Sequence, residues 1–148
     1  MLTITIDKDQ SAVVWIFSGT VNTDDDYGRY VASIEALRSL VQQHGGGVGL
    51  LFAEAGNPPP NAVWRKRIAE ASAHFPPGCF FILVSESLVI RSIATAINWL
   101  RPPTYKLTTA ATLEEGLAWL SSHRTAENVA AVRRTFLRAQ VESRLGKR

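Results

Sequence analysis

The chain has 148 residues, of which 46% are hydrophobic and 20% are charged, so it is large enough for one globular domain with a buried core. Its net charge of +3 arises near the C-terminus, because residues 124–148 carry +5 and the other 123 residues carry −2. The apolar run 79–84 is far shorter than the roughly 20 residues of a membrane span, and residues 1–10 do not have the pattern of a signal peptide. We therefore expect a cytoplasmic protein without a transmembrane segment.

Two strands come first in chain order. Residues 2–6 alternate between apolar and polar, and residues 12–17 form a continuous apolar run, so the short connection between them predicts an antiparallel hairpin. A helix follows. Thr23 and Asp26 have the spacing of a capping box at its start, and Gly45 is placed to end it.

Two strand–helix pairs come next. Residues 48–53 and 79–84 are apolar runs of strand length, which is typical of parallel strands covered on both faces. The helix between them is predicted from the spacing of Trp64, Ile68, Ala71 and Phe75. The second helix covers residues 88–100, and its helical projection predicts a sheet-facing side composed of Val89, Ile90, Ile93, Ala94, Ala96, Ile97 and Leu100.

A fifth strand is predicted at residues 104–109, followed by a helix at 112–120 and a last helix at about 125–145. The order β-β-α-β-α-β-α-β-α plus an extra C-terminal helix predicts an α/β fold with a mixed, mostly parallel five-stranded sheet. We expect residues 1–122 to form the α/β domain and residues 123–148 to form a basic helical extension. Its charges lack the accompanying aromatic or glycine–arginine pattern that would favour nucleic acid.

Two segments carry a family resemblance. "VSESLVIRSIATAINWLRPP" (residues 84–103) and "TLEEGLAWL" (residues 112–120) resemble the SpoIIAA-like branch of the STAS domains, the sulphate-transporter and anti-sigma-factor-antagonist family. This resemblance implies a STAS-like fold over residues 1–122 and a role in regulation or signalling through protein–protein contacts, with a homodimer as one form of partner.

The sequence departs from that family at one important place. Phosphorylatable STAS domains carry an aspartate–serine pair just after the third strand. Here residues 52–64 read "FAEAGNPPPNAVW" and contain no serine or threonine. We therefore expect a module without the phosphorylation switch.

Polar residues follow the predicted strands at their carboxyl ends, where open α/β sheets bind ligands. Each group precedes a helix N-terminus, whose free N–H groups can hold an anion, although serine and asparagine also act there as simple helix caps. A small-ligand or anion-binding domain is therefore the alternative function. Its candidate residues are Ser18, Thr20, Asn57, Asn61, Ser85 and Ser87.

A large aromatic residue, Trp99, falls on the mainly polar side of the helix at residues 88–100, where it is a candidate anchor for another element or subunit. The candidate interface residues are Leu88, Arg91, Thr95, Trp99 and, on the last helix, Phe136. The sequence indicates no catalytic constellation, metal site or cofactor. The acidic run 24–26 is better explained as a helix start than as a cation site, because consecutive helical residues point about 100° apart.

Overall fold

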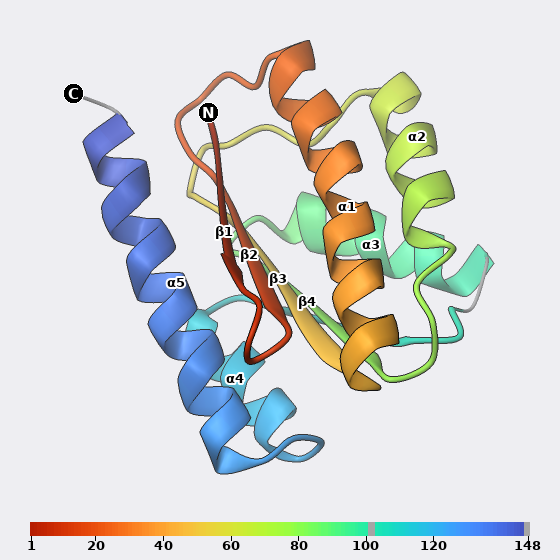
Figure 1. Ribbon diagram of the computed structural model, residues 1–148. Helices are drawn as coiled ribbons and strands as arrows, with labels where there is room; N and C mark the ends of the chain where they lie inside the picture. The colour runs from red at the N-terminus through yellow and green to blue at the C-terminus, as the bar shows by residue number, and fades with distance from the viewer. Residues whose placement is uncertain (101–102, 147–148) are drawn as a thin grey trace.

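The computed structural model describes residues 1–100 and 103–146, without the side chains of residues 97–100. It is an α/β fold with a five-stranded sheet and five helices (Figure 1). The strands are β1 (Leu2–Asp7), β2 (Ala12–Phe17), β3 (Gly47–Ala53), β4 (Cys79–Ser85) and β5 (Lys106–Ala110). The helices are α1 (Asp24–His44), α2 (Ala62–Ser72), α3 (Leu88–Leu100), α4 (Leu113–Ser121) and α5 (Ala126–Gly146). In the described chain, no helix combines the length and the apolar character needed to cross a bilayer.

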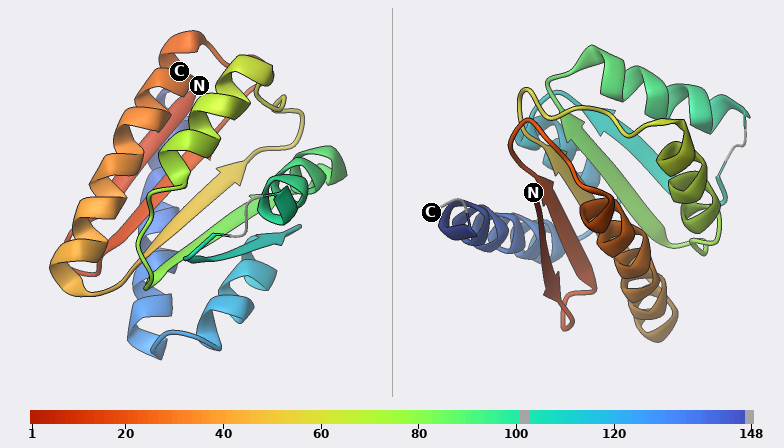
Figure 2. Two further views of the ribbon diagram at one scale, coloured as in Figure 1. Left: turned by 90° about the vertical axis from the view of Figure 1, so that its right-hand side faces the viewer. Right: turned by 90° about the horizontal axis from the view of Figure 1, so that it is seen from above.

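The strands lie in the sheet in the same order as in the chain, β1-β2-β3-β4-β5. β1 pairs with β2 in antiparallel fashion, with Ile4 opposite Trp15, and the other three pairs are parallel. The predicted α/β class with a mixed five-stranded sheet is confirmed. α1, α2 and α3 lie over one face of the sheet, and α4 and α5 lie over the other (Figure 2).

The predicted helix signals around α1 are confirmed. The Thr23 hydroxyl accepts a hydrogen bond from the Asp26 N–H, and the Asp26 carboxylate accepts one from the Thr23 N–H, which completes a capping box. Gly45 ends the helix in the left-handed conformation, with φ of 76°, which glycine adopts without steric cost. α2 is shorter than the sequence predicts, because it ends at Ser72 and leaves Phe75 beyond it in the core.

The first core lies between the sheet and α1. Alternate residues of the strands point to this side, and Trp15 fills its centre, with its indole Nε1 donating to the Ser33 hydroxyl at 2.6 Å. Gly49 provides the space for this large ring, because a Cβ there would lie 2.9 Å from the Trp15 ring and 2.6 Å from Leu37. Glycine at this position of β3 therefore allows α1 to pack closely on the sheet.

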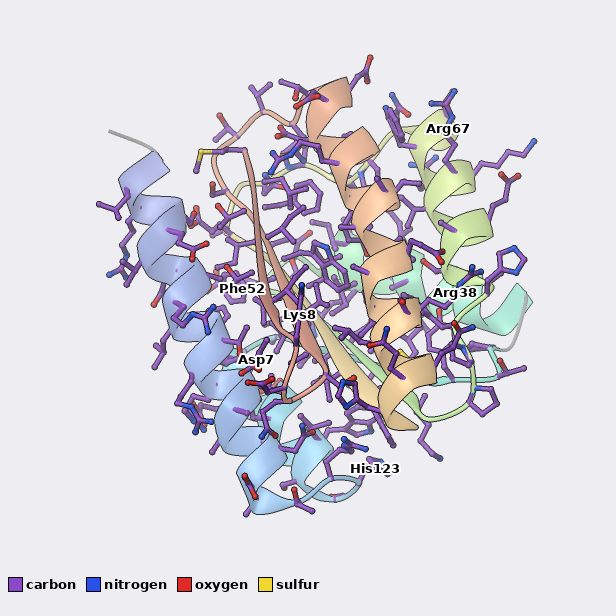
Figure 3. The ribbon with its side chains drawn as sticks, viewed as in Figure 1. Asp7, Lys8, Arg38, Phe52, Arg67 and His123 are labelled. Carbon is purple, nitrogen blue, oxygen red and sulfur yellow. The ribbon has the colours of Figure 1, made fainter. Side chains whose placement is uncertain are left out.

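The second core lies on the opposite face, where α4 covers β4 and β5 and α5 covers β1 and β2. On α5 the buried apolar residues of this cluster are Val132, Phe136 and Ala139, and the Phe136 ring packs on Phe52 at 5.1 Å between centroids. Figure 3 shows Phe52 on the side of the sheet that faces α5. The boundary expected at residue 122 is therefore not a boundary of the core, since α5 belongs to the same cluster as the strands.

The buried side of α3 is narrower than the sequence predicts. Ile90 and Ala94 pack against the core as expected, but Val89 is 61% exposed and Ala96 is also exposed. α3 covers the end of the sheet formed by β4 and β5 and runs crosswise to α1 and α2 (Figure 1). A helix at the end of a sheet has strands beneath only part of its surface, so a narrower strip of its residues is buried.

Candidate ligand-binding cavity

A cavity of about 280 Å³ lies between α2, α3 and the sheet. Its floor is the sheet face that also carries the first core, with apolar side chains from four strands: Phe17, Leu51, Ala53, Phe81, Leu83 and Leu107. α3 contributes Ile90, Ile93 and Ala94. α2 contributes residues at helical spacing along one side, namely Arg65, Ile68, Ala69 and Ser72, and its C-cap residue Ala73 continues this side.

The space exists because α2 packs mainly against α1 rather than against the strands. Trp64 holds α2 in this position. Its ring stacks on Tyr27 at 5.6 Å between centroids, and its Nε1 donates to the Asp24 carboxylate at 2.8 Å. The side of α2 over the sheet has the small residues Ala69 and Ser72, which do not fill the gap. Figure 2 shows α2 and α3 on the same face, with strands visible between them.

Two asparagines form one end of the cavity. Asn22 and Asn57 each donate from Nδ2 to the Oδ1 of the other, at 2.9 Å in both directions. Asn22 also donates to the Tyr27 hydroxyl at 2.9 Å, and Asn57 donates to the carbonyl of Gly19 at 3.0 Å. This reciprocal pair ties the loop after β2 to the loop after β3. Both amides are largely occupied by these bonds, so they form a fixed polar wall.

The tyrosines of the cavity are neutral at pH 7. Burial is the main reason that the pKa of Tyr105 rises to about 12, and burial also raises the pKa of Tyr27 and, further still, that of Tyr30. Tyr30 is only 2% exposed, and within the described chain its hydroxyl makes no hydrogen bond. It therefore presents an unused polar group among the apolar walls.

One of the six ligand residues expected from the sequence, Asn57, lines the cavity. The others have local roles or none. Asn61 caps α2 by accepting from the Trp64 N–H, the Ser85 hydroxyl accepts from the Ser87 N–H, and the Ser87 hydroxyl accepts from the Ile90 N–H. Ser18 is fully buried in the turn after β2, and Thr20 is exposed.

The strand order explains this difference. An open α/β sheet forms a crevice at its strand ends where neighbouring connections leave toward opposite faces. Here the three connections through α1, α2 and α3 all cover one face. The cavity consequently lies over the face of the sheet, under α2 and α3, rather than beyond the ends of the strands.

The residues expected at an interface do not lie on one surface. Leu88, Arg91 and Thr95 line one depression on α3, which Thr109 of β5 also lines, and Leu88 is 69% exposed. Phe136 was expected at an interface, but it is 4% exposed and packs inside the chain, so that expectation is corrected. The side chain of Trp99 lies outside the described residues.

Sequence reasoning missed most of the residues that form the cavity, including Tyr27, Tyr30 and Arg65. The available signal was on α2, where the apolar stripe ends in Ala69, Ser72 and Ala73 and so has too little volume to fill a helix–sheet interface. Over residues 1–100 and 103–146, no group of three or more histidine, cysteine, aspartate or glutamate side chains has the arrangement of a metal site.

Comparisons with family models, curated proteins and solved structures give no match for this chain.

Proposed function

We infer that this protein is a binding module for a small, mainly apolar molecule held in the cavity between α2, α3 and the sheet. The observation that carries the proposal is the cavity itself, which has apolar walls from the strands, α2 and α3 and a few polar groups at defined places. Ligand sites in proteins commonly have this composition. At about 30 Å³ for each water-sized group, the volume corresponds to roughly nine non-hydrogen atoms.

The test uses 1-octanol, which has a suitable size, in isothermal titration calorimetry. Ala69 lines the cavity from α2, so Ala69→Phe should fill the space and remove binding. Ala62→Phe introduces the same side chain on the same helix at an exposed position outside the lining, so it should leave binding unchanged. Absence of octanol binding to the unmodified chain, or equal binding by both variants, would overturn the proposal.

The regulatory role implied by the STAS resemblance is a second candidate. It is supported by the order of strands and helices and by exposed apolar groups on α3: Leu88, which lies near Arg91 and Thr95, is 69% exposed, and Val89 is 61% exposed. Exposed apolar groups of this size are common at protein–protein contacts. α3 also forms a wall of the cavity through Ile90 and Ile93, so a bound ligand and a partner protein would contact the same helix.

If α3 mediates self-association, Leu88→Asp should shift the chain toward the monomer in sedimentation velocity. Val63→Asp is the matched control, because Val63 is similarly exposed on α2 and distant in sequence from α3. A chain that is monomeric at all concentrations would rule out the homodimer, and an equal shift from both variants would show that α3 is not the specific surface.

A further inference from the structure

The cavity contains one ionised side chain among its described lining residues, Arg65 on the first turn of α2. The other polar lining groups are amides, hydroxyls and phenols, and no described lining residue is acidic. The phenols of Tyr27 and Tyr105 are neutral at pH 7, and burial raises the pKa of each above its ordinary value. The cavity is therefore an apolar space with an uncompensated positive charge on its wall.

The guanidinium of Arg65 makes one hydrogen bond, and its other N–H donors have no partner in the described chain. Its Nη1 donates to the Pro60 carbonyl at 3.0 Å, and it makes no other hydrogen bond and no ion pair with the rest of the described chain. The edge formed by Nε–H and Nη2–H is left without a partner. Two parallel N–H donors of this kind match the two oxygens of a carboxylate, and the bond to Pro60 reduces the entropy lost when they bind.

The shape of the cavity sets the rest of the ligand. Its α2 wall extends from Arg65 to Ala73, which is about 12 Å at 1.5 Å per residue. Along this length α2 contributes the apolar Ile68, and α3 and the strands contribute Ile90 and other apolar side chains, which favour a hydrocarbon chain. The α2 wall thus has its charge at the N-terminal end of a mainly apolar surface.

We propose that the cavity takes a medium-chain monocarboxylic acid, with the carboxylate on the free edge of Arg65 and the hydrocarbon chain along α2. This rests on the proposed function and adds the chemical class of the ligand. An acid of about eight carbons has close to the number of atoms that the volume accommodates. The carboxylate needs no further counter-ion, because Arg65 supplies the charge.

The experiment compares octanoate with 1-octanol, which has the same chain without the charge, by calorimetry at pH 7. Octanoate should bind at least tenfold more tightly than octanol to the unmodified protein. Arg65→Met should remove this preference while octanol affinity stays within about twofold, and Arg65→Lys should restore part of it. Arg67→Met is the control, because Arg67 lies on the same helix with its charge over the Trp64 ring and outside the cavity lining.

The outcomes separate the two proposals. Equal affinity for octanoate and octanol, or an octanoate preference that survives Arg65→Met, would overturn the carboxylate assignment and leave the binding module standing. If Arg65→Met and Arg65→Lys each lose octanol binding, the side chain of Arg65 is needed for the shape of the cavity. That result would also overturn the carboxylate assignment. Failure of octanol to bind the unmodified chain would overturn the binding module, and the carboxylate assignment with it, because the assignment rests on that function.

Discussion

At the scale of single residues, Gly49 shows how closely α1 packs on β3. A methyl group at this position would lie 2.6 Å from Leu37 and 2.9 Å from the Trp15 ring, with Phe81 at 3.1 Å. Leu37 and Trp15 are themselves fully buried in the first core, so they have little room to move. The α1 side of β3 therefore requires glycine for steric reasons, without any demand on its backbone angles.

Gly49→Ala should lower the free energy of unfolding by about 1–3 kcal/mol, the usual cost of overpacking a core. Gly28→Ala is the matched control. It lies in α1, and its added methyl group would approach no closer than 3.9 Å to Trp64. Because alanine is the better helix former, this change should raise the free energy of unfolding by up to about 1 kcal/mol. Urea denaturation measures both, and equal effects from the two changes would contradict the steric explanation.

At the scale of elements, α5 has two apolar stripes with different roles. The residues Val132, Phe136 and Ala139 face β1 and β2 and are buried. The second stripe, Leu137, Val141 and Leu145, is at least 50% exposed at every position. The Thr5 hydroxyl on β1 also donates a hydrogen bond of 2.8 Å to the Glu142 carboxylate on α5.

This arrangement predicts unequal effects for two adjacent substitutions on α5. Phe136→Ala removes a buried ring that packs on Phe52, so it should cost about 3–5 kcal/mol in the free energy of unfolding. Leu137→Ala should change it by no more than about 0.5 kcal/mol, because that side chain is 50% exposed. Denaturant titration of each variant is the measurement. Similar costs would mean that the exposed stripe is covered in solution.

At the scale of the whole molecule, local signals in the sequence predicted the order of strands and helices well. The alternation of apolar runs and amphipathic segments fixed the order of strands and helices, and the capping box at Thr23 and the glycine at 45 fixed the ends of α1. These features depend on neighbours within a few residues, such as the hydrogen bonds between Thr23 and Asp26. Local interactions of that range can be identified from one sequence.

The cavity could not be predicted in the same way, because it depends on how far α2 stands from the sheet. That distance follows from the packing of Trp64 on Tyr27 and from its bond to Asp24, residues about 40 positions apart. The placement of α5 is a similar case. Both of its stripes are apolar in sequence, and only the structure shows that the stripe with Phe136, which contacts Phe52, is the buried one.

The agreement between chain order and sheet order has a consequence for how the molecule assembles. Each strand from β2 to β5 can join the sheet as soon as the strand before it is in place, so no pairing has to close a loop longer than one helix and its two connections. The docking of α5 on β1 is the exception, since Thr5 and Glu142 are 137 positions apart. During synthesis, the β1–β2 hairpin must therefore keep Val14 and Ile16 uncovered until α5 has been made. This open surface makes the nascent chain prone to aggregation at that stage.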